Sequence, residues 1–253
     1  MAQITGRRPR ALATGGSEGL GGAFVELLLA SGYDVVSVDR NAPPAASMAV
    51  GIICDLADRV ALDRNLDAIV AAGPYRLVLF NAGVSATGRF EAVPLEAYRR
   101  LVAVNTEAPM VLASALVNAD AVNGHLCFVS SLSHFTGYPG AAVYAASKDA
   151  LAAYAKSVRK PFAQRGVSVT VAYPGPLRTA HAARHAPPGA SVERRTDPAA
   201  AARHIVGAAL AGRAAVYSDA RARMLALAGR LMPDLTIRAM RRVIFDRLDR
   251  DVW

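Results

Sequence analysis

The sequence predicts an α/β fold in which helices cover both faces of a parallel β-sheet. Short, nearly continuous apolar runs alternate with longer segments of helical periodicity over the first two-thirds of the chain. Such runs are typical of strands that are buried on both faces, and strands that alternate with helices are typical of parallel sheets. The chain has 253 residues, and no linker rich in Pro, Gly or Ser divides it before residue 180. We therefore expect one main domain, over residues 1–220.

Each apolar run predicts a strand, and each periodic segment predicts a helix. Residues 180–199 are polar and rich in proline, which predicts a mobile loop. A helix near 198–211, a strand at 214–218 and a two-helix tail over 221–253 follow this loop. The earlier helices are expected around residues 20–31, 58–71, 95–119 and 143–165. The earlier strands are expected at residues 10–14, 34–39, 49–54, 77–81, 124–130 and 168–173.

The composition excludes several classes of protein. A hydrophobic fraction of 53% and a charged fraction of 19% exclude a disordered chain. Two cysteines, Cys54 and Cys127, exclude a disulfide framework and a cysteine-based zinc site, and both lie in apolar runs typical of a core. The sequence contains no run of 18 or more apolar residues, so no membrane-spanning helix is predicted. Residues 1–16 lack the apolar region of a secretory signal. The expected location is the cytoplasm.

The net charge of +9 is concentrated near the end of the chain. Residues 201–253 contain 10 basic and 5 acidic residues, against 19 and 15 in residues 1–200. No basic segment with interleaved aromatic residues occurs, so we expect no nucleic-acid partner. The tail is amphipathic, which favours packing on the domain or on a partner subunit, with an anionic membrane surface as the alternative. Its apolar stripe, Ile237, Met240, Ile244 and Leu248, alternates with Arg238, Arg241, Arg242, Arg247 and Arg250.

A glycine-rich loop between the first strand and the first helix indicates a nucleotide site. Glycines allow a tight turn that approaches a pyrophosphate closely, and the N-terminus of the following helix presents free N–H groups. Three spaced glycines alone also fit an ordinary turn, but the strand before the loop and the helix after it favour a dinucleotide. The residues expected at the cofactor are Gly15, Ser17, Glu18, Gly19, Leu20 and Gly21.

The ends of the next three strands supply further candidates for cofactor binding. Ligands of open α/β sheets bind at the carboxyl ends of the strands, so Asp55-Leu56 and Asn81-Ala82-Gly83 are expected near the glycine loop. Asp39 ends the second strand, where a carboxylate can accept hydrogen bonds from both ribose hydroxyls. This favours NAD over NADP, because the carboxylate would repel the additional phosphate. Arg40 opposes this interpretation, since it could reach a phosphate.

Tyr144 and Lys148 are spaced to share one face of a helix, and Ser130-Ser131 ends an upstream apolar run. A tyrosine needs roughly 3–4 kcal/mol to ionise near neutral pH, and a cation about 4 Å away supplies up to ~4 kcal/mol. The tyrosine could then exchange a proton with an alcohol or ketone oxygen while a hydride moves to or from a nicotinamide.

Together these motifs resemble the classical short-chain dehydrogenase/reductase family, over residues 10 to about 180. The resemblance rests on TGGSEGLG at 14–21, NAG at 81–83, Asn105, VSS at 129–131, YAAS-K at 144–148 and PGPLRT at 174–179. It implies that Tyr144 is the acid/base and that Lys148 lowers its pKa and holds the nicotinamide ribose. It implies further that Ser131 positions the substrate oxygen, that Ser130 is a structural neighbour and that Asn105 anchors a proton-relay water. Pro174, Gly175, Leu177 and Thr179 are expected to border the nicotinamide.

The resemblance also implies the fold, the reaction and the assembly. The fold would be a Rossmann-type, doubly wound, seven-stranded parallel sheet of order 3-2-1-4-5-6-7 in a single domain with a helical C-terminal tail. The protein would be an NAD(P)-dependent oxidoreductase that interconverts a secondary alcohol and a ketone, with NAD as the preferred cofactor. It would form a homodimer or homotetramer through the helices near 95–119 and 143–165.

Two alternatives stay open at this stage. A non-enzymatic dinucleotide sensor would need the glycine loop, but not the joint presence of Tyr144, Lys148, Ser131 and Asn105. His181 and His185 have the spacing of half a metal site, but no third ligand lies nearby in the sequence, so no metal is expected and a solvated or substrate-covering role is favoured. The residues His134, Phe135 and Tyr138 suit substrate contact and core packing equally.

Overall fold

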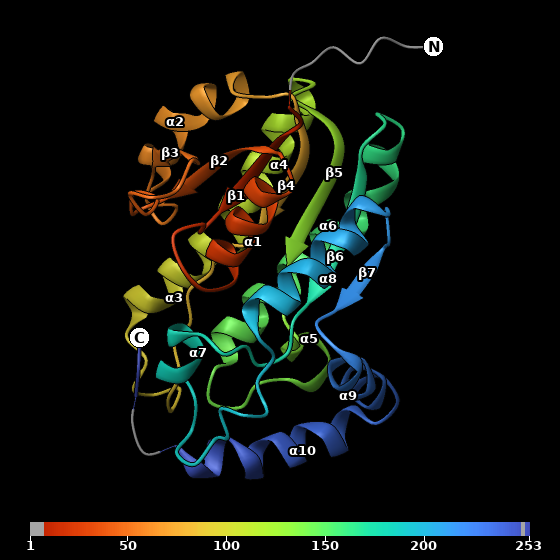
Figure 1. Ribbon diagram of the computed structural model, residues 1–253. Helices are drawn as coiled ribbons and strands as arrows, with labels where there is room; N and C mark the ends of the chain where they lie inside the picture. Colours follow the sequence, from red (N-terminus) through yellow and green to blue (C-terminus); the bar gives the residue numbers. More distant parts are fainter. Residues whose placement is uncertain (1–7, 249–250) are drawn as a thin grey trace.

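The computed structural model describes residues 8–248 and 251–253 and confirms the predicted fold (Figure 1). Seven parallel strands form one sheet in the order β3-β2-β1-β4-β5-β6-β7. Three strands have the predicted bounds, and the others differ by one or two residues at each end. The strands are β1 (Arg10–Thr14), β2 (Asp34–Asp39), β3 (Val50–Ile53), β4 (Tyr75–Phe80), β5 (Val122–Val129), β6 (Ser168–Tyr173) and β7 (Ala215–Tyr217).

The helices connect these strands and extend beyond the last one. A π-helical segment, Ala103–Glu107, and a 3-10 turn, Phe245–Arg247, complete the regular structure of the described residues. The α-helices are α1 (Gly19–Ala30), α2 (Arg59–Ala71), α3 (Leu95–Val102), α4 (Ala108–Asn118), α5 (Ser133–Thr136), α6 (Ala142–Ala163), α7 (Ala180–Arg184), α8 (Pro198–Leu210), α9 (Ala220–Leu231) and α10 (Pro233–Val243).

Successive residues of each central strand face two separate hydrophobic cores. In β4, Leu77 and Leu79 join the core beneath α1 and α8, while Val78 and Phe80 join the core beneath α4 and α6. All four side chains are buried. A strand with a core on each side needs apolar residues at every position, which explains why the sequence shows continuous runs rather than alternation.

The helix expected over 95–119 is divided in the structure. Helices α3 and α4 are separated by the π-helical segment, whose wider turns are common at functional sites. By length and composition alone, the stretch Leu95–Asn118 could cross a membrane, but half of its most apolar window is buried inside the protein. Leu112 and Leu116 of α4 are fully buried against the sheet. The apolar residues of this stretch therefore cover one face of the sheet.

The loop predicted over 180–199 is partly helical. Thr179 begins α7, because its side-chain oxygen accepts a hydrogen bond from the N–H of Ala182. Asp197 likewise accepts from the N–H of Ala200 and begins α8, with Pro198 at the first helical position. The expectation of an irregular loop is thus wrong for residues 180–184, whereas the helix expected near 198–211 begins at Pro198 as predicted.

The C-terminal tail packs on its own domain. Helix α9 contacts α5 through a seam of small residues, Ala222, Ala226 and Gly229, all of which are buried. The predicted apolar stripe of the second helix also lies against the domain, since Ile237 contacts Gly137 and Leu248 contacts Gly140. Val252 pairs with Thr87 through two backbone hydrogen bonds of 2.7 Å. Arg250 lies outside the described residues.

Two helical glycines provide a matched test of this packing. The position of a Cβ atom at Gly229 is occupied by the backbone carbonyl of Phe135, whereas nothing lies within 4 Å at Gly207 in α8. We expect Gly229→Ala to lower the free energy of unfolding by about 1–3 kcal/mol through overpacking. We expect Gly207→Ala to raise it by about 0.5–1 kcal/mol. Chemical denaturation of both variants checks the signs, and equal effects would contradict the packing of α9 on α5.

Candidate active site

A cleft of about 590 Å³ opens at the carboxyl ends of the strands. It lies where the strand order reverses between β1 and β4, the position at which doubly wound sheets bind nucleotides. Most of the residues expected at the cofactor and in catalysis line it. These are Gly15, Ser17, Glu18, Gly19, Leu20, Asp39, Arg40, Asp55, Leu56, Asn81, Ala82, Gly83, Tyr144, Lys148, Pro174, Leu177 and Thr179.

The glycine loop is held against the loop that follows β4. The Thr14 hydroxyl accepts hydrogen bonds from the N–H groups of Asn81 and Ala82 at 3.0 and 3.1 Å. The Asn81 side-chain amide donates to the carbonyls of Thr14 and Gly15, both at 3.2 Å. Gly15 has φ +68°, and a Cβ there would lie 2.8 Å from the Cα of Ala82. Only glycine fits where the glycine loop passes the loop after β4, which explains the first glycine of the motif.

Gly21 acts below the loop rather than in the cleft. A Cβ on Gly21 would collide with the Gly15 carbonyl oxygen, so α1 can approach β1 closely only because this position has no side chain. Glu18 at the start of α1 makes no side-chain capping bond, so the first N–H groups of the helix are available to a ligand. A positively polarised helix end beside a glycine turn fits the pyrophosphate of a dinucleotide.

Asp39 has a structural role that its position in the sequence does not reveal. One carboxylate oxygen accepts hydrogen bonds from the Ser17 N–H at 3.0 Å and from the Ser17 hydroxyl at 2.8 Å. The other oxygen accepts from the N–H of Asn41 at 3.0 Å. Asp39 therefore connects the end of β2 to the glycine loop while it faces the cleft. Arg40 also lines the cleft, and its side chain is exposed.

The Asp55 side chain holds the next part of the rim in place. Its carboxylate accepts a hydrogen bond from the N–H of Ala57 at 2.9 Å and lies 3.5 Å from a guanidinium nitrogen of Arg100. Arg100 comes from α3 and lines the cleft. The guanidinium of Arg100 therefore lies at the edge of the cleft beside Asp55, whereas the sequence predicted only the Asp55 carboxylate there.

Lys148 lies at the floor of the cleft and is only 3% exposed. Its ammonium group donates a hydrogen bond of 2.9 Å to the carbonyl of Val129 at the end of β5. Burial lowers the pKa of Lys148 to about 8, because the charged form loses its hydration. A Cβ on Gly83 would lie 3.1 Å from the Lys148 Nζ. The last residue of the NAG motif must therefore be small where the lysine passes beneath it.

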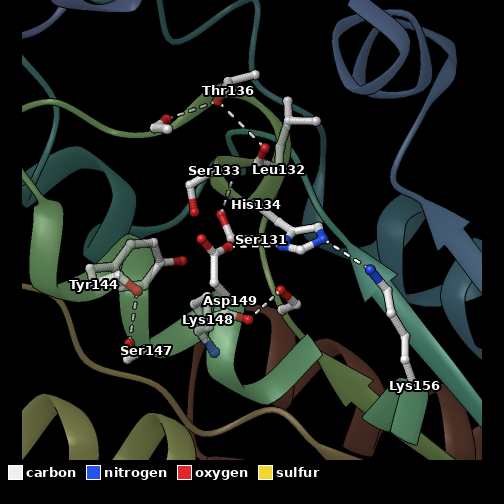
Figure 2. A network of polar contacts seen from close by, with 12 residues as sticks. Ser131, Leu132, Ser133, His134, Thr136, Tyr144, Ser147, Lys148, Asp149 and Lys156 are labelled. Carbon is white, nitrogen blue, oxygen red and sulfur yellow. Dashed lines mark hydrogen bonds and ion pairs between the residues drawn. The ribbon is translucent and has the colours of Figure 1, made fainter. Parts of the chain in front are cut away.

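Tyr144 lies one turn before Lys148 in α6 and faces Ser131, which follows β5 (Figure 2). Desolvation raises the pKa of Tyr144, and a hydrogen bond with Ser131 opposes that shift. The net shift is upward, and the charge of Lys148 is not among its causes, so the lowering of this pKa by Lys148 stays a prediction. The Ser131 hydroxyl also accepts a hydrogen bond from the N–H of Ser133 at 3.2 Å.

Asn105 is fully buried in the π-helical segment and does not line the cleft. Its side chain accepts from the N–H of Val84 at 2.8 Å and donates to the Val84 carbonyl at 2.9 Å. It also donates to the Ser147 hydroxyl at 2.9 Å, and that hydroxyl donates to the Tyr144 carbonyl at 2.8 Å. Asn105 therefore connects the loop after β4 to the first turn of α6.

Three more residues from the motifs lie in or beside the cleft. Ser130 is buried, and its hydroxyl donates to the Lys148 carbonyl at 2.9 Å, which agrees with its expected structural role. Gly175 does not line the cleft, and its N–H donates a hydrogen bond to the Ser218 hydroxyl at 3.0 Å. Ser131 also lies outside the lining, although it contacts Tyr144.

Of the three candidates His134, Phe135 and Tyr138, the first two are packing residues. His134 is bound to Asp149 at 2.8 Å and lies 3.1 Å from the Lys156 ammonium, with its ring stacked on another aromatic residue (Figure 2). Phe135 is buried among other aromatic rings. Tyr138 instead contacts the Tyr144 ring edge to face, with the ring centroids 6.4 Å apart. Tyr138 is thus the member of this trio that adjoins the candidate acid/base.

The two histidines of the 180–199 segment have different surroundings. His181 lines the cleft, where desolvation and the positive charge of Lys148 lower its pKa. His185 is buried, and its Nδ1 lies 2.6 Å from the Thr87 hydroxyl oxygen. Of the two expected roles, the solvated one is wrong for His185, because its ring is buried against Thr87, and the substrate-covering one stays a prediction. Among residues 8–248 and 251–253, no group of three or more His, Cys, Asp or Glu side chains suits a metal ion.

Some cleft residues were not anticipated from the sequence. Arg178 lies inside the PGPLRT motif between two expected residues, so its position could have been read from the motif. Arg100 and Val104 come from helical residues without a motif, and Cys54 was assigned to the core alone. The complete set of additional lining residues is Val38, Asn41, Cys54, Val84, Arg100, Val104, Val129, Ser130, Arg178, Ala180, His181 and Pro198.

Comparison with known proteins identifies the family. The sequence pattern of the family described as short chain dehydrogenase matches residues 9–188. The chain belongs to the short chain dehydrogenase family. An uncharacterized oxidoreductase of Myxococcus xanthus is 34% identical over 188 residues, which cover 69% of this chain and 74% of that protein. The 3-oxoacyl-(acyl-carrier-protein) reductase MabA of Mycobacterium tuberculosis is 29% identical over 171 residues, covering 66% and 69%.

Solved structures agree with this assignment. A short chain dehydrogenase from Burkholderia cenocepacia, determined in complex with NADP, superposes with a TM-score of 0.77 at 26% identity. The match covers 93% of this chain and 97% of that chain. The short chain dehydrogenase assignment makes this protein an oxidoreductase that uses NAD(P), and the glycine loop and the free end of α1 fit the dinucleotide.

The buried lysine predicts a pH dependence of stability. Since the folded pKa is about 8 and the ordinary value is 10.5, the unfolded chain retains a proton between these pH values that the folded protein has released. Stability should therefore rise with pH over this interval, by up to about 1.4 kcal/mol per pH unit. Lys148→Met should remove this rise, whereas Lys160→Met, at an exposed site of α6, should retain it. Denaturation curves at pH 7 to 10 test this, and identical slopes for Lys148→Met and wild type would contradict it.

Proposed function

We propose that the protein interconverts a secondary alcohol and a ketone by hydride transfer, with Tyr144 as the acid/base. The observation that carries this proposal is the placement of Tyr144 and Lys148 on one face of α6, at the floor of the cleft into which the glycine loop opens. The nicotinamide would accept or supply the hydride. A dinucleotide sensor would need the cleft but not a tyrosine in its lining beside a buried lysine.

Each proposed catalytic residue has a separate task. In the reductive direction Tyr144 donates its phenolic proton to the ketone oxygen as the hydride reaches the carbonyl carbon, and in the oxidative direction it takes that proton back. Ser131 holds the substrate oxygen by a hydrogen bond. Lys148 binds the nicotinamide ribose, and its positive charge favours the phenolate that forms during reduction. Asn105 fixes the loop after β4 and the start of α6, and holds a water of the proton relay.

The remaining motif residues are proposed to hold the cofactor. The turn at Gly15, Ser17, Glu18, Gly19, Leu20 and Gly21 would receive the pyrophosphate. The Asp55-Leu56 and Asn81-Ala82-Gly83 segments would flank the adenine and the ribose, and Pro174, Gly175, Leu177 and Thr179 would border the nicotinamide. Residues 1–220 would form the catalytic domain, and residues 180–200 would cover the substrate.

We propose that NAD is preferred over NADP. Asp39 presents a carboxylate at the end of β2, and its bonds to Ser17 and Asn41 fix the negative charge at the ribose position. An added phosphate would meet this charge at close range. Arg40 and the NADP of the Burkholderia relative favour the opposite preference, so the choice depends on which of the two neighbouring side chains contacts the ribose.

We also propose a cytoplasmic homodimer or homotetramer assembled through α3, α4 and α6. Leu95 is 86% exposed and Val102 is 49% exposed on α3, which leaves apolar surface for a second subunit. This contact would leave the cleft open, because the cleft lies at the ends of the strands.

Tyr144→Phe is the direct test of the proposed acid/base. The variant keeps the ring and removes the proton, so turnover should fall by at least about a hundredfold while NAD(P) binding persists. Tyr154→Phe serves as the control and should retain activity. Tyr154 lies on α6, as Tyr144 does, and its hydroxyl donates a hydrogen bond to the Met110 carbonyl of α4. The measurement is hydride transfer at the nicotinamide absorbance with a panel of alcohols and ketones. Full activity of Tyr144→Phe would assign the proton to another residue, and binding of NAD(P) without turnover on any substrate would favour a sensor.

The cofactor preference is tested by kcat/KM with NAD and with NADP on one substrate. A repulsion of about 2–3 kcal/mol corresponds to roughly 30–150-fold preference for NAD. Asp39→Ala should narrow or invert this ratio. Asp39→Asn retains an acceptor for Ser17 without the charge, so a similar change in both variants would attribute the preference to charge rather than to the position of the loop. Equal efficiency of the wild-type protein with both cofactors would show that Arg40 prevails.

A further inference from the structure

Helix α9 exposes its large apolar residues and buries its small ones. Met224, Leu227 and Leu231 are 71%, 58% and 70% exposed. The buried positions of the same helix are Ala222, Ala226 and Gly229. With about 100° between successive residues, the two sets lie on opposite sides of the helix. Since the small residues already dock α9 on α5, the outward apolar stripe takes no part in holding the helix to its domain.

The outward stripe continues beyond the end of α9. Met232, between the two helices, is 50% exposed, and Leu235 of α10 is 60% exposed. Val243 at the end of α10 is also exposed. The inward face of α10 is supplied by other residues, since Ile237 lies against Gly137. The exposed apolar residues therefore form a patch on α9 and α10 in addition to the docking face.

The segment that carries this patch is rich in arginine, although Arg230 lies over the Phe135 ring and Arg241 lines a pocket with Ile237. Residues 220–247 contain seven arginines and two aspartates, which gives this segment a net charge of +5. Within the part of the chain that the structure describes, these arginines form one ion pair, between Arg241 and Asp246 at 3.7 Å. Arg242 is exposed on the same side of α10 as Leu235. Arg238 is exposed at the edge of this side and also lines a pocket next to Ile237.

We propose that this outward face of α9 and α10 binds the surface of an anionic phospholipid bilayer. Exposed apolar side chains bordered by arginines are the combination that holds an amphipathic helix at the boundary between headgroups and acyl chains. A second copy of the chain is a poorer occupant, because a symmetric contact would place two such segments, each of charge +5, against one another. An anionic surface instead satisfies both the apolar and the basic residues.

The position of the two helices suits this contact. Figure 1 shows α10 lying across one end of the molecule, beyond the carboxyl ends of the strands. The face is therefore accessible to a planar surface without rearrangement of the sheet. Binding is expected to be peripheral and reversible, since no segment of α9 or α10 is long enough to span a bilayer.

Vesicle flotation of the full chain tests the proposal. The probes are vesicles of phosphatidylcholine alone and vesicles in which about one-third of the lipid is phosphatidylglycerol, at about 0.1 M salt. The protein should float with the anionic vesicles, stay behind with the neutral ones, and be released by high salt. No flotation with anionic vesicles, or equal flotation with both kinds, would overturn the proposal.

Two double variants separate the apolar from the basic contribution. Leu227→Ser with Leu231→Ser, and Arg238→Gln with Arg242→Gln, should each lower the partition coefficient by at least about tenfold. The matched control is Val60→Ser with Arg64→Gln on α2, where both residues are exposed, and it should bind as the wild type does.

Unchanged melting temperature and NAD(P) binding establish that each variant is folded. Light scattering of the same samples identifies the competing occupant. If the leucine variant converts an oligomer to a smaller species and the wild type does not float, the face is an interface between copies of the chain and the proposal is wrong. Loss of flotation in both tail variants, with wild-type mass in solution, would support it.

Discussion

The hydrogen bonds between the Thr14 hydroxyl and the backbone of Asn81 and Ala82 hold together the two loops on which the site depends. They fix the glycine loop against the end of β4 at the point where the strand order reverses. Because Gly15 touches Ala82 and Gly83 passes over Lys148, this one crossing determines both the nucleotide end of the cleft and the room above its reactive floor. The absence of side chains at these positions is a steric requirement of the crossing.

The end of the cleft that contains Tyr144 and Lys148 is built on a buried polar framework. Lys148 donates a hydrogen bond to the Val129 carbonyl. Asn105 and Ser147 connect the loop after β4 to the carbonyl of Tyr144. A satisfied network in a site of low dielectric constant fixes the direction of each side chain, whereas an unsatisfied one would be costly. The same burial lowers the pKa of the lysine and raises that of the tyrosine, so the framework sets the protonation states as well as the geometry.

The tail shows how one helix can have two different apolar faces. Helix α9 approaches α5 so closely that a side chain at Gly229 would meet the Phe135 carbonyl, and its exposed leucines and methionine lie away from the buried alanines and glycine. Beyond α10 the chain returns to the main domain and pairs with Thr87, whose hydroxyl lies against the buried His185. The tail thus packs on the domain near Gly137, Gly140 and Thr87 with its inner side and leaves its outer side available.

The sequence by itself determined the strands and the glycine-rich turn, because strands buried on both faces and spaced glycines leave strong local patterns. The strand order and most of the cleft residues followed from motifs that resemble those of a known family. The bounds of β1, β2 and β6 follow directly from their apolar runs. Tertiary structure alone decided the π-helical segment around Asn105, since its apolar spacing resembles that of a continuous helix. It also decided the tether between Asp39 and Ser17, the arrival of Arg100 at the cleft and the upward pKa shift of Tyr144. Each of these depends on contacts or desolvation between segments far apart in the chain, which local periodicity does not record.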